Sequence, residues 1–397
     1  MTADQTPYLR VKIASADVST HVWNLDVEDR DRGTDVATML LDDPSSAVAD
    51  GLQEGQHVEI DLGWESEHAL VFVGCLTSVN PVSRNHTESR VRVKAQDISH
   101  LMTREPAITG PRLTRQHVGT LEEIVTAIAD RHMIPLGEVS VDPMPSWTED
   151  EPLLQACDQN DWQFLQDVAE DHHARAFVEV NAAEGDTAAQ RERGGQARLY
   201  LMSEEALLSQ DPMGKLHYCR GHGRLLEFDY TRTGGGASPS ATATVTDPSS
   251  GSTQTSTGPE PAAGPDPQAS PERAAEIARR HGERRAEDYA AGVQMAADSE
   301  VQPGDMRART TVTGLPSSPE LAERRIQQDR TRILGFQGRG VAMGTIFLRA
   351  KGPVEIDGLA SWAAGRWYVH RVNHVVQRTR VDSATALTFR SRFVATK

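Results

Sequence analysis

Hydrophobic and polar residues alternate over short stretches between positions 8 and 97, which is the pattern of β-strands with one buried face. Turn residues separate these stretches, among them Asp-Arg-Gly at 31–33 and Asp-Pro at 43–44. The predicted strands are Val22–Asp29, Ala37–Asp42, Val58–Gly63, Ala69–Val79 and Ser89–Ala95. Several short strands at this spacing indicate a small barrel or sandwich.

The pattern becomes helical after residue 97. Ile98–Thr103 is expected to form a single helical turn. Thr120 and Glu123 have the spacing of a capping box, in which the hydroxyl accepts an amide of the first turn and the carboxylate reaches back. The helix that follows carries an apolar face and is expected to end before Pro135; its apolar residues are Leu121, Ile124, Val125 and Ile128.

Residues 153–180 predict a helix followed by a strand. Asn160 or Asp161 can cap this helix. The apolar residues Trp162, Phe164, Leu165, Val168 and Ala169 then recur at helical spacing. After a polar break, Ala176, Val178 and Val180 alternate with Phe177 and Glu179 as in a strand. Together with a strand at Arg198–Met202, this predicts an α+β unit between about 105 and 215.

The rest of the chain contains a low-complexity stretch between two strand-rich parts. Residues 217–232 and Gly340–Phe393 have strand character, whereas Gly234–Ala269 is nearly all Gly, Ser, Thr, Ala and Pro. Such a composition favours a flexible linker, although Ala241–Val245 alternates enough for an edge strand. Two helices are expected to follow, opening at Ser270-Pro-Glu and Ser318-Pro-Glu, the second ending at Gly335.

A repeat connects the first and last parts of the chain. Val58-Glu-Ile-Asp-Leu-Gly is echoed by Val354-Glu-Ile-Asp-Gly-Leu. Farther on, the segment from Val71 resembles the segment from Trp367, and the segment from Val91 resembles the segment from Ala386. Because the three pieces follow one another in the same order, we interpret them as a duplicated β-barrel.

The predicted fold is mainly β, with two similar β-barrels, an inserted α+β domain and a flexible Gly/Ser/Pro linker. The expected divisions are 1–104 for the first barrel and 105–215 for the insertion. The second barrel comprises 216–233 and 335–397, the linker 234–269 and the helical segments 270–334.

Composition narrows the class of protein. The chain of 397 residues is 38% hydrophobic and 25% charged, typical of a soluble globular protein. No apolar run reaches the length of about 18 residues that a membrane span needs, and no secretory signal is apparent. The three cysteines, Cys75, Cys157 and Cys219, are widely separated, which argues against a disulfide framework or zinc site and favours synthesis in the cytoplasm.

The formal net charge of −16 argues against a nucleic-acid partner, for which a basic surface is expected. Two arginine clusters occur, but each is interleaved with acidic residues. They comprise Arg279, Arg280, Arg284 and Arg285, and Arg324, Arg325, Arg330 and Arg332. Pairs such as Glu276–Arg280 and Glu320–Arg324 favour solvated helix faces over an anion site.

No motif indicates an active site. The pairs His172-His173 and His217/His222 lack carboxylates at zinc-site spacing, and Thr233-Gly-Gly-Gly lacks the Lys of a phosphate loop. Ser361 has no nucleophile-elbow motif. The carboxylate pairs Glu59/Asp61 and Glu355/Asp357 share a strand face as glycosidase carboxylates could, but their duplication argues for a structural role. We expect no catalytic, cofactor or metal residues, and no enzyme.

The order of several motifs resembles that of baseplate hub proteins in contractile injection systems. The helix motif D-W-x-F-L begins at Asp161, with His173 where that family has Gly. The other motifs are Asp42-Asp-Pro44, Gly55–Gly63, Phe72–Leu76, Val93–Asp97, Val354–Leu359 and Gly365–His374. This family includes phage tail protein D, also called late control D, and the hub region of VgrG.

The resemblance implies a structural protein whose two barrels flank an α+β insertion. It implies a homotrimer that imitates the six-fold tail tube and joins it to a trimeric spike. The expected partners are the tube protein, the spike and other baseplate components, within a phage tail-like particle. Because the sequence stops at Lys397, soon after the second barrel, the spike is expected to be a separate chain.

Two other functions stay open. A tail-associated cell-wall hydrolase would use Glu355 or Asp357 as its acid and base. An effector carrier would hold its cargo in the lumen or on the 234–269 linker.

Overall fold

The computed structural model describes most of the chain outside the low-complexity region. The described ranges are 6–84, 88–104, 114–180, 197–218, 224–232, 242–246, 253–257, 336–360, 363–381 and 384–397, with scattered positions between 275 and 290. The chain divides into two units, one of residues 1–229, 338–358 and 365–397, the other of 230–337 and 359–364.

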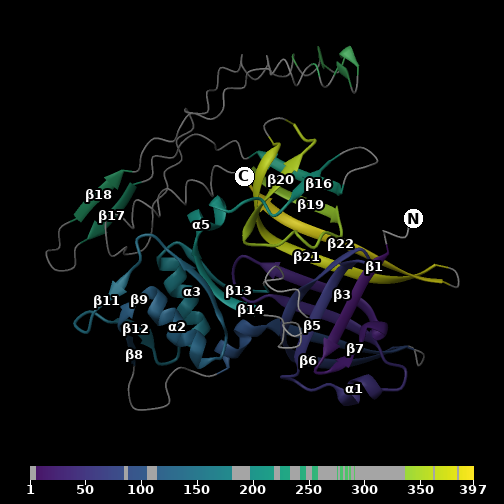
Figure 1. Ribbon diagram of the computed structural model, residues 1–397, viewed down its shortest axis with the longest axis horizontal. Coiled ribbons are helices and arrows are strands. Elements are labelled where there is room, and N and C mark those ends of the chain that lie inside the picture. Colours follow the sequence, from purple (N-terminus) through teal and green to yellow (C-terminus); the bar gives the residue numbers. More distant parts are fainter. Residues whose placement is uncertain are drawn as a thin grey trace. The chain divides into compact units, whose positions relative to one another are not determined.

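One curled 13-stranded sheet dominates the larger unit and makes the protein mainly β (Figure 1). From the N-terminal part it takes β1 (Pro7–Ile13), β2 (Ala16–Asp17), β3 (Val22–Arg30), β4 (Val36–Asp42), β5 (His57–Trp64), β6 (Glu67–Arg84) and β7 (Glu88–Asp97). From later parts it takes β15 (Lys215–His217), β16 (Leu225–Arg232), β19 (Phe336–Met343), β20 (Gly352–Asp357), β21 (Gly365–Val381) and β22 (Ala384–Thr396). All five predicted N-terminal strands are confirmed, and β6 extends farther at both ends than predicted.

Strand order joins the two strand-rich parts of the sequence in a single ladder. The order is β16-β19-β22-β21-β3-β4-β7-β6-β5-β1-β2, with β20 beside β21 and β15 beside β20. The pairing of β21 with β3, from Arg371 opposite Arg30 to Gln377 opposite Asn24, is the point where the parts meet. We call this pairing the seam.

The strands on the two sides of the seam follow the same order. We call β3 to β7 the first repeat, and β16, β19, β20, β21 and β22 the second repeat. In the first, β5 pairs with β6 and β6 with β7; in the second, β20 pairs with β21 and β21 with β22, all antiparallel. In the first repeat, β7 is followed across the sheet by β4 and then β3. In the second repeat, β22 is followed in the same way by β19 and then β16. The two VEID segments therefore lie on equivalent strands.

The strand register corrects the residue alignment expected from the sequence. Val58 lies opposite Gly74 and Val354 opposite Trp367, so Gly74 and not Val71 is the counterpart of Trp367. The register also breaks at matching places, between Leu76 and Ser78 and between Val369 and Arg371. The sequence comparison was wrong here because the two copies have hairpins of different length, which displaces later residues. In the third strand, Arg90 corresponds to Arg390.

An α/β segment lies between the repeats in sequence. It contains a three-stranded sheet in the order β10-β14-β13, formed by β10 (Leu136–Ser140), β13 (Ala174–Val180) and β14 (Ala197–Ser203). Its helices are α2 (Leu121–Arg131), α3 (Asp161–Asp171) and α5 (Glu204–Ser209). The paired short strands are β8 (Thr114–His117) with β12 (Leu153–Ala156), and β9 (Gly119–Thr120) with β11 (Ser146–Trp147).

Both predicted helices of this segment begin as their caps indicate. Thr120 accepts the Glu123 amide and Glu123 accepts the Thr120 amide, which confirms the capping box. Asn160, and not Asp161, caps α3, because its side chain accepts the amide of Gln163. The apolar faces of α2 and α3 pack in a common core against β13 and β14, with Trp162 among the buried residues.

The smaller elements agree with the sequence in part. Residues 98–103 form a 3-10 helix, η3 (Ile98–Thr103), where one helical turn was expected; η2 (Ser19–His21) and α1 (Ala47–Gly51) were not predicted. Within the predicted linker, β17 (Thr242–Thr246) and β18 (Thr253–Thr257) form an antiparallel hairpin. Scattered positions from 275 to 290 are helical, whereas the helix expected from Ser318 lies outside the described residues.

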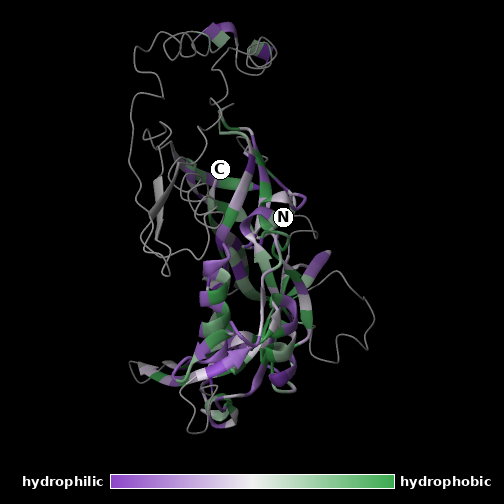
Figure 2. Cartoon of the chain, turned by 90° about the vertical axis from the view of Figure 1, so that its left-hand side faces the viewer, coloured by the Kyte–Doolittle hydropathy of each residue, from purple (hydrophilic) through white to green (hydrophobic). Residues whose placement is uncertain are grey.

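Hydropathy along the strands follows their burial. Figure 2 shows green and purple residues interspersed along the strands of the sheet. The core of the first repeat contains Leu25, Met39, Ile60, Leu76 and Val93, each fully buried. Among the helices that the structure describes, none has the length and apolar character needed to cross a membrane.

Candidate functional site: the seam between the two repeats

The turn before β20 carries Lys351, whose ammonium group is buried in the larger unit. Its Nζ donates to Asp29 on β3, to Asp35 Oδ2 at 3.1 Å and to Glu179 Oε2 on β13 at 3.2 Å. The Lys351 side chain is 3% exposed. One side chain of the second repeat therefore binds carboxylates of the first repeat and of the α/β segment.

The neighbouring residues strengthen this connection. Arg349 Nη1 donates to Glu179 Oε1 at 3.1 Å and to Val71 O at 2.9 Å. The Ala350 amide donates to Asp29 Oδ2 at 2.8 Å. We call Arg349, Lys351, Asp29, Asp35 and Glu179 the lysine cluster.

The lysine cluster contains three carboxyl groups but only two basic side chains, and this imbalance determines the protonation of its acids. Burial alone would raise the pKa of Asp29, but the charges of Lys351 and Arg349 hold it below its usual value. Burial raises the pKa of Asp35 well above its usual value, with further contributions from Asp29, Asp97 and Glu179. The ammonium therefore keeps Asp29 ionised, while the shortage of cations favours a protonated Asp35.

Asp97, at the end of β7, extends this group of acids. Its Oδ2 accepts the Asp35 amide at 2.6 Å, and its Oδ1 accepts the Ser99 amide at 2.7 Å at the start of η3. Burial raises the pKa of Asp97 to about 6. The carboxyl consequently remains partly protonated in mildly acidic solution.

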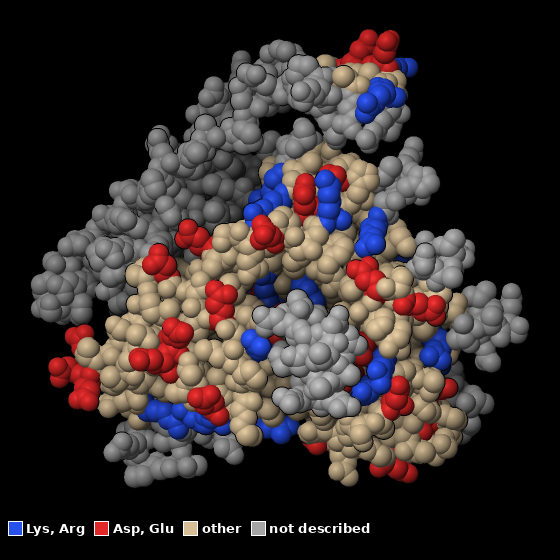
Figure 3. Space-filling view, in the orientation of Figure 1, with Lys and Arg blue, Asp and Glu red and all other residues tan. Residues whose placement is uncertain are grey.

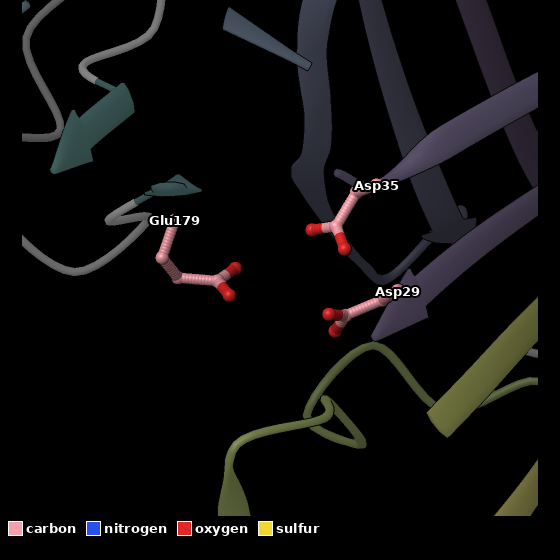
Figure 4. Close-up of side chains that lie close together, drawn as sticks. All are labelled: Asp29, Asp35 and Glu179. Carbon is pink, nitrogen blue, oxygen red and sulfur yellow. The ribbon is translucent and has the colours of Figure 1, made fainter. Parts of the chain in front are cut away.

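The three carboxyl groups of the cluster also have the spacing of a cation site. One oxygen from each of Asp29, Asp35 and Glu179 lies within 4.8 Å of the others, and the side chains point toward one another (Figure 4). Lys351 Nζ is hydrogen-bonded to all three, so this ammonium is the cation of the site. The geometry fits a structural junction better than a metal centre.

Hydrophobic contacts cross the seam as well. Val376 of β21 and Phe389 of β22 are buried in the core of the first repeat. The Trp64 indole donates to Gly344 O at 2.7 Å, and the Asn373 amide donates to Asp26 Oδ1 at 3.0 Å. Arg371 lies 3.5 Å from Glu28. The seam thus combines backbone pairing, apolar packing and polar contacts.

The carboxylates considered for acid–base chemistry have structural partners. Asp357 accepts from Lys215 and His217 on the adjacent strand β15. Burial would raise the pKa of Asp357, but these two partners lower it, which is unfavourable for a general acid. Glu59 lies 4.0 Å from Lys12 on β1 and Glu355 lies 3.4 Å from Lys215 on β15, so a lysine of the adjacent strand lies beside each of these glutamates.

The remaining sequence candidates do not form a common site among the described residues. His172 caps α3 and lies edge-on to Trp147, while His173 has a positive φ of 53°. His222, Cys219, Ser361 and the glycines at 234–236 lie outside the described residues. On the face shown in Figure 3, acidic and basic side chains lie interspersed over the described surface.

Sequence reasoning missed the lysine cluster. Asp29, Asp35, Glu179 and Lys351 are distant in sequence and belong to no motif. The available signal was a lysine within a strand-rich segment, which by itself indicates an exposed side chain. Only the strand pairing at the seam brings these groups together.

The fold is shared with solved tail proteins. A tail protein from Neisseria meningitidis MC58 matches with a TM-score of 0.61 and 9% identity, covering 99% of this chain and 97% of that one. The 43 kDa tail protein of prophage MuSo2 from Shewanella oneidensis matches with a TM-score of 0.59 and 10% identity, covering 98% of both chains.

A secretion-system component has the same fold. An E. coli component of the type VI secretion system, described as similar to bacteriophage T4 tail proteins, matches with a TM-score of 0.54 and 11% identity. The match covers 97% of this chain and 76% of that one. The three structural matches show that the chain has the fold of these proteins.

No protein-family model matches the chain, and no curated protein matches it significantly.

Proposed function

We propose that this chain is the central hub of a contractile tail or injection-system baseplate, a structural protein and not an enzyme. The observation that carries the proposal is the tail-protein fold over nearly the full length of the chain. The order of motifs in the sequence supports the same family.

The proposed hub is a homotrimer that joins the hexameric tube to the trimeric spike. Each chain contributes two repeats with equivalent strand order, so three chains present six similar units. We interpret the two repeats as the predicted barrels, and residues 114–209 as the insertion between them. A trimer of this kind matches six-fold symmetry on one side and three-fold symmetry on the other.

The lysine cluster supports a mechanical role for the seam. A hub transmits force during sheath contraction, and its two repeats must keep a constant geometry. Because Lys351 of the second repeat bonds groups of the first repeat and of the α/β segment, separating any of them would expose an unpaired buried charge.

The test is deletion of the gene in the producing strain, followed by electron microscopy of the purified particles. Loss of baseplates while the tube and sheath proteins are still made, restored by a plasmid copy, is expected. Quantitative mass spectrometry should find half as many copies of the hub as of tube subunits in one ring. Normal particles in the deletion strain would refute the proposal.

A zymogram on cell-wall substrate separates the hub from a hydrolase. We expect no clearing by the wild-type chain. Clearing that is abolished by Glu355→Gln or Asp357→Asn would favour the enzyme.

A further inference from the structure

The second half of β6 forms an open edge of the sheet. Residues 67–75 pair with β5 on one side, whereas Ser78–Arg84 pair only with β7 among the described strands. Ser78, Asn80, Pro81 and Ser83 are exposed. An open edge presents backbone groups to which a further strand can pair.

The equivalent half of β21 is not open. Ser78 corresponds to Arg371, Asn80 to Asn373 and Val82 to Val375, because each pair follows the same register break. Arg371–Gln377 pair with β22 on one side and with β3 on the other. Within the chain, the seam therefore shows what occupies this edge of a repeat.

The strand of the second repeat that corresponds to β3 is β16. The Asp43 amide donates to Ser89 O at 3.0 Å and the Gly344 amide to Phe389 O at 3.1 Å, so β19 lies beside β22 as β4 lies beside β7. The Met343 amide donates to Arg224 O at 2.8 Å, which places β16 beside β19.

Burial then determines the residue correspondence between β3 and β16. Leu225 and Val22 are both buried at the starts of their strands. Three residues later, Leu25 lies opposite Met39, and the ring of Phe228 lies against Gly340, the counterpart of Met39, as well as against Gly338. Asp229 is therefore the counterpart of Asp26, and Glu227 the counterpart of Asn24. Among the strands that the structure describes, β16 is the end strand of the sheet, and its outer side forms a second open edge.

We propose that Val79–Arg84 of one copy pairs antiparallel with β16 of a second copy, in the register of the seam. Val82 then lies opposite Asp229 as Val375 lies opposite Asp26. The Asn80 amide reaches the Asp229 carboxylate as the Asn373 amide reaches Asp26. This inference rests on the proposed function, for which it supplies the contact between subunits.

The side chains at this register favour a second copy as the occupant. Asn80 and Asp229 repeat the Asn373–Asp26 pair, and both are exposed in the single chain.

Pro81 makes the open edge selective. The amide of Asp97 on β7 donates to Asp35 O beside β4, so the backbone groups of Asp97 and of every second residue before it face β4. The backbone groups of Arg92 and its alternating neighbours therefore face β6. The partners of these residues on β6 are Ser78, Asn80 and Val82, which leaves Val79, Pro81 and Ser83 facing the open edge. Since proline has no amide hydrogen, one donor is lost there. Pairing of an unrelated strand with this edge is therefore weakened, whereas a strand whose side chains match those of β6 still pairs.

Disulfide trapping tests the register. Val82→Cys and Asp229→Cys are introduced into the full chain together with Cys157→Ser and Cys219→Ser. Opposite residues of a non-hydrogen-bonded antiparallel pair have the separation that a disulfide needs. The intrachain control is Asp26→Cys with Val375→Cys, and the mismatched control is Val82→Cys with Arg339→Cys, one strand farther in.

Under mild oxidation we expect Val82→Cys/Asp229→Cys to form covalent oligomers that end at a closed trimer. The interchain fraction should exceed that of the mismatched control by at least about tenfold, because pairing holds the two thiols together. The intrachain control should close within one chain. Failure to form interchain bonds, or closure of the two introduced thiols inside one chain, would overturn the inference.

A charge-exchange pair gives a second measurement that does not depend on oxidation. Asn80→Asp places a carboxylate beside Asp229 and should weaken self-association in sedimentation by about three- to tenfold. Adding Asp229→Asn restores an amide–carboxylate pair and should recover the association. No weakening, or no recovery, would overturn the inference.

The two proposals fail in different ways. If the chain is incorporated into particles but the introduced thiols do not cross-link, the subunit contact is wrong and the hub remains. If the chain is absent from particles, the hub is wrong regardless of the cross-link.

Discussion

Lys351 Nζ lies 3.2 Å from Glu179 Oε2, and this contact joins the second repeat to the α/β segment. The same ammonium binds Asp29 and Asp35 of the first repeat. Three parts of the chain that are remote in sequence therefore share one buried cation, and their mutual arrangement depends on it.

Lys351→Met should destabilise the fold strongly. It leaves the buried carboxyl groups of Asp29 and Asp35 and the half-buried one of Glu179 without their ammonium, and breaking such a buried pair costs about 3–5 kcal/mol. Denaturant unfolding at pH 7 measures the loss. The matched control is Lys215→Met, which removes an exposed lysine that also binds two carboxylates and should change the unfolding free energy far less, because solvent screens exposed ion pairs. Equal effects of the two changes would contradict the role of the cluster.

Lys351→Ala should convert the cluster into a divalent-cation site. Without the ammonium, oxygens of Asp29, Asp35 and Glu179 that lie within 4.8 Å of one another face a space suited to Ca²⁺. We expect millimolar Ca²⁺ to raise the thermal midpoint of this variant and to leave the wild type unchanged. Adding Asp35→Asn should remove the response. A variant insensitive to Ca²⁺ would show that the side chains rearrange.

His374 should make stability depend on pH. Its Nε2 donates to Leu348 O at 3.1 Å, and its Nδ1 accepts from Ser391 Oγ at 2.9 Å, so the buried ring is neutral. Burial lowers the pKa of His374 to about 4. Because the unfolded chain binds the proton near pH 6.5, this contribution is present above about pH 6.5 and is lost as the pH falls toward 4.

The measurement is the unfolding free energy of the wild type minus that of His374→Gln. This difference should fall by about 2–3 kcal/mol between pH 7 and pH 4.5. Asp97 acts in the opposite direction, since its raised pKa favours folding as the pH falls through about 6, but it is present in both proteins and cancels. A difference that is constant with pH would contradict the assignment.

Phe389→Ala should destabilise both repeats together. Phe389 belongs to the second repeat but is buried at 4% exposure in the core of the first. Such a truncation costs about 3–5 kcal/mol, and calorimetry should show one transition at a lower temperature. Arg390→Ala, at the next and exposed position, should leave the transition within about 0.5 kcal/mol of the wild type. Two separate transitions in the wild type would contradict the shared core.

Local signals predicted much of the fold. Alternation identified the strands from Val22 to Ala95, and the capping pair Thr120/Glu123 identified the start of α2. These predictions succeeded because burial of one strand face and satisfaction of helix-end amides depend on residues close in sequence. The VEID repeat likewise identified equivalent strands, although not the residue correspondence beyond them.

The candidate site was not predictable in the same way. Lys351 has no sequence feature that distinguishes it from an exposed lysine, and Asp29 occupies a buried position in an otherwise alternating strand. Their pairing requires β21 to lie beside β3, a contact between segments more than 300 residues apart. No periodicity within either strand specifies that neighbour.

The sequence by itself determined the strands from Val22 to Ala95, the helices α2 and α3 and the equivalence of the two VEID strands, because hydrophobic periodicity, caps and repeated segments are local properties of the chain. Only the tertiary structure decided that the repeats share one sheet, that Lys351 binds carboxyl groups of the first repeat and of the α/β segment, and that β6 and β16 have open edges among the described strands. The reason is physical: strand pairing and ion pairing act between groups adjacent in space, and a sequence records only neighbours along the chain.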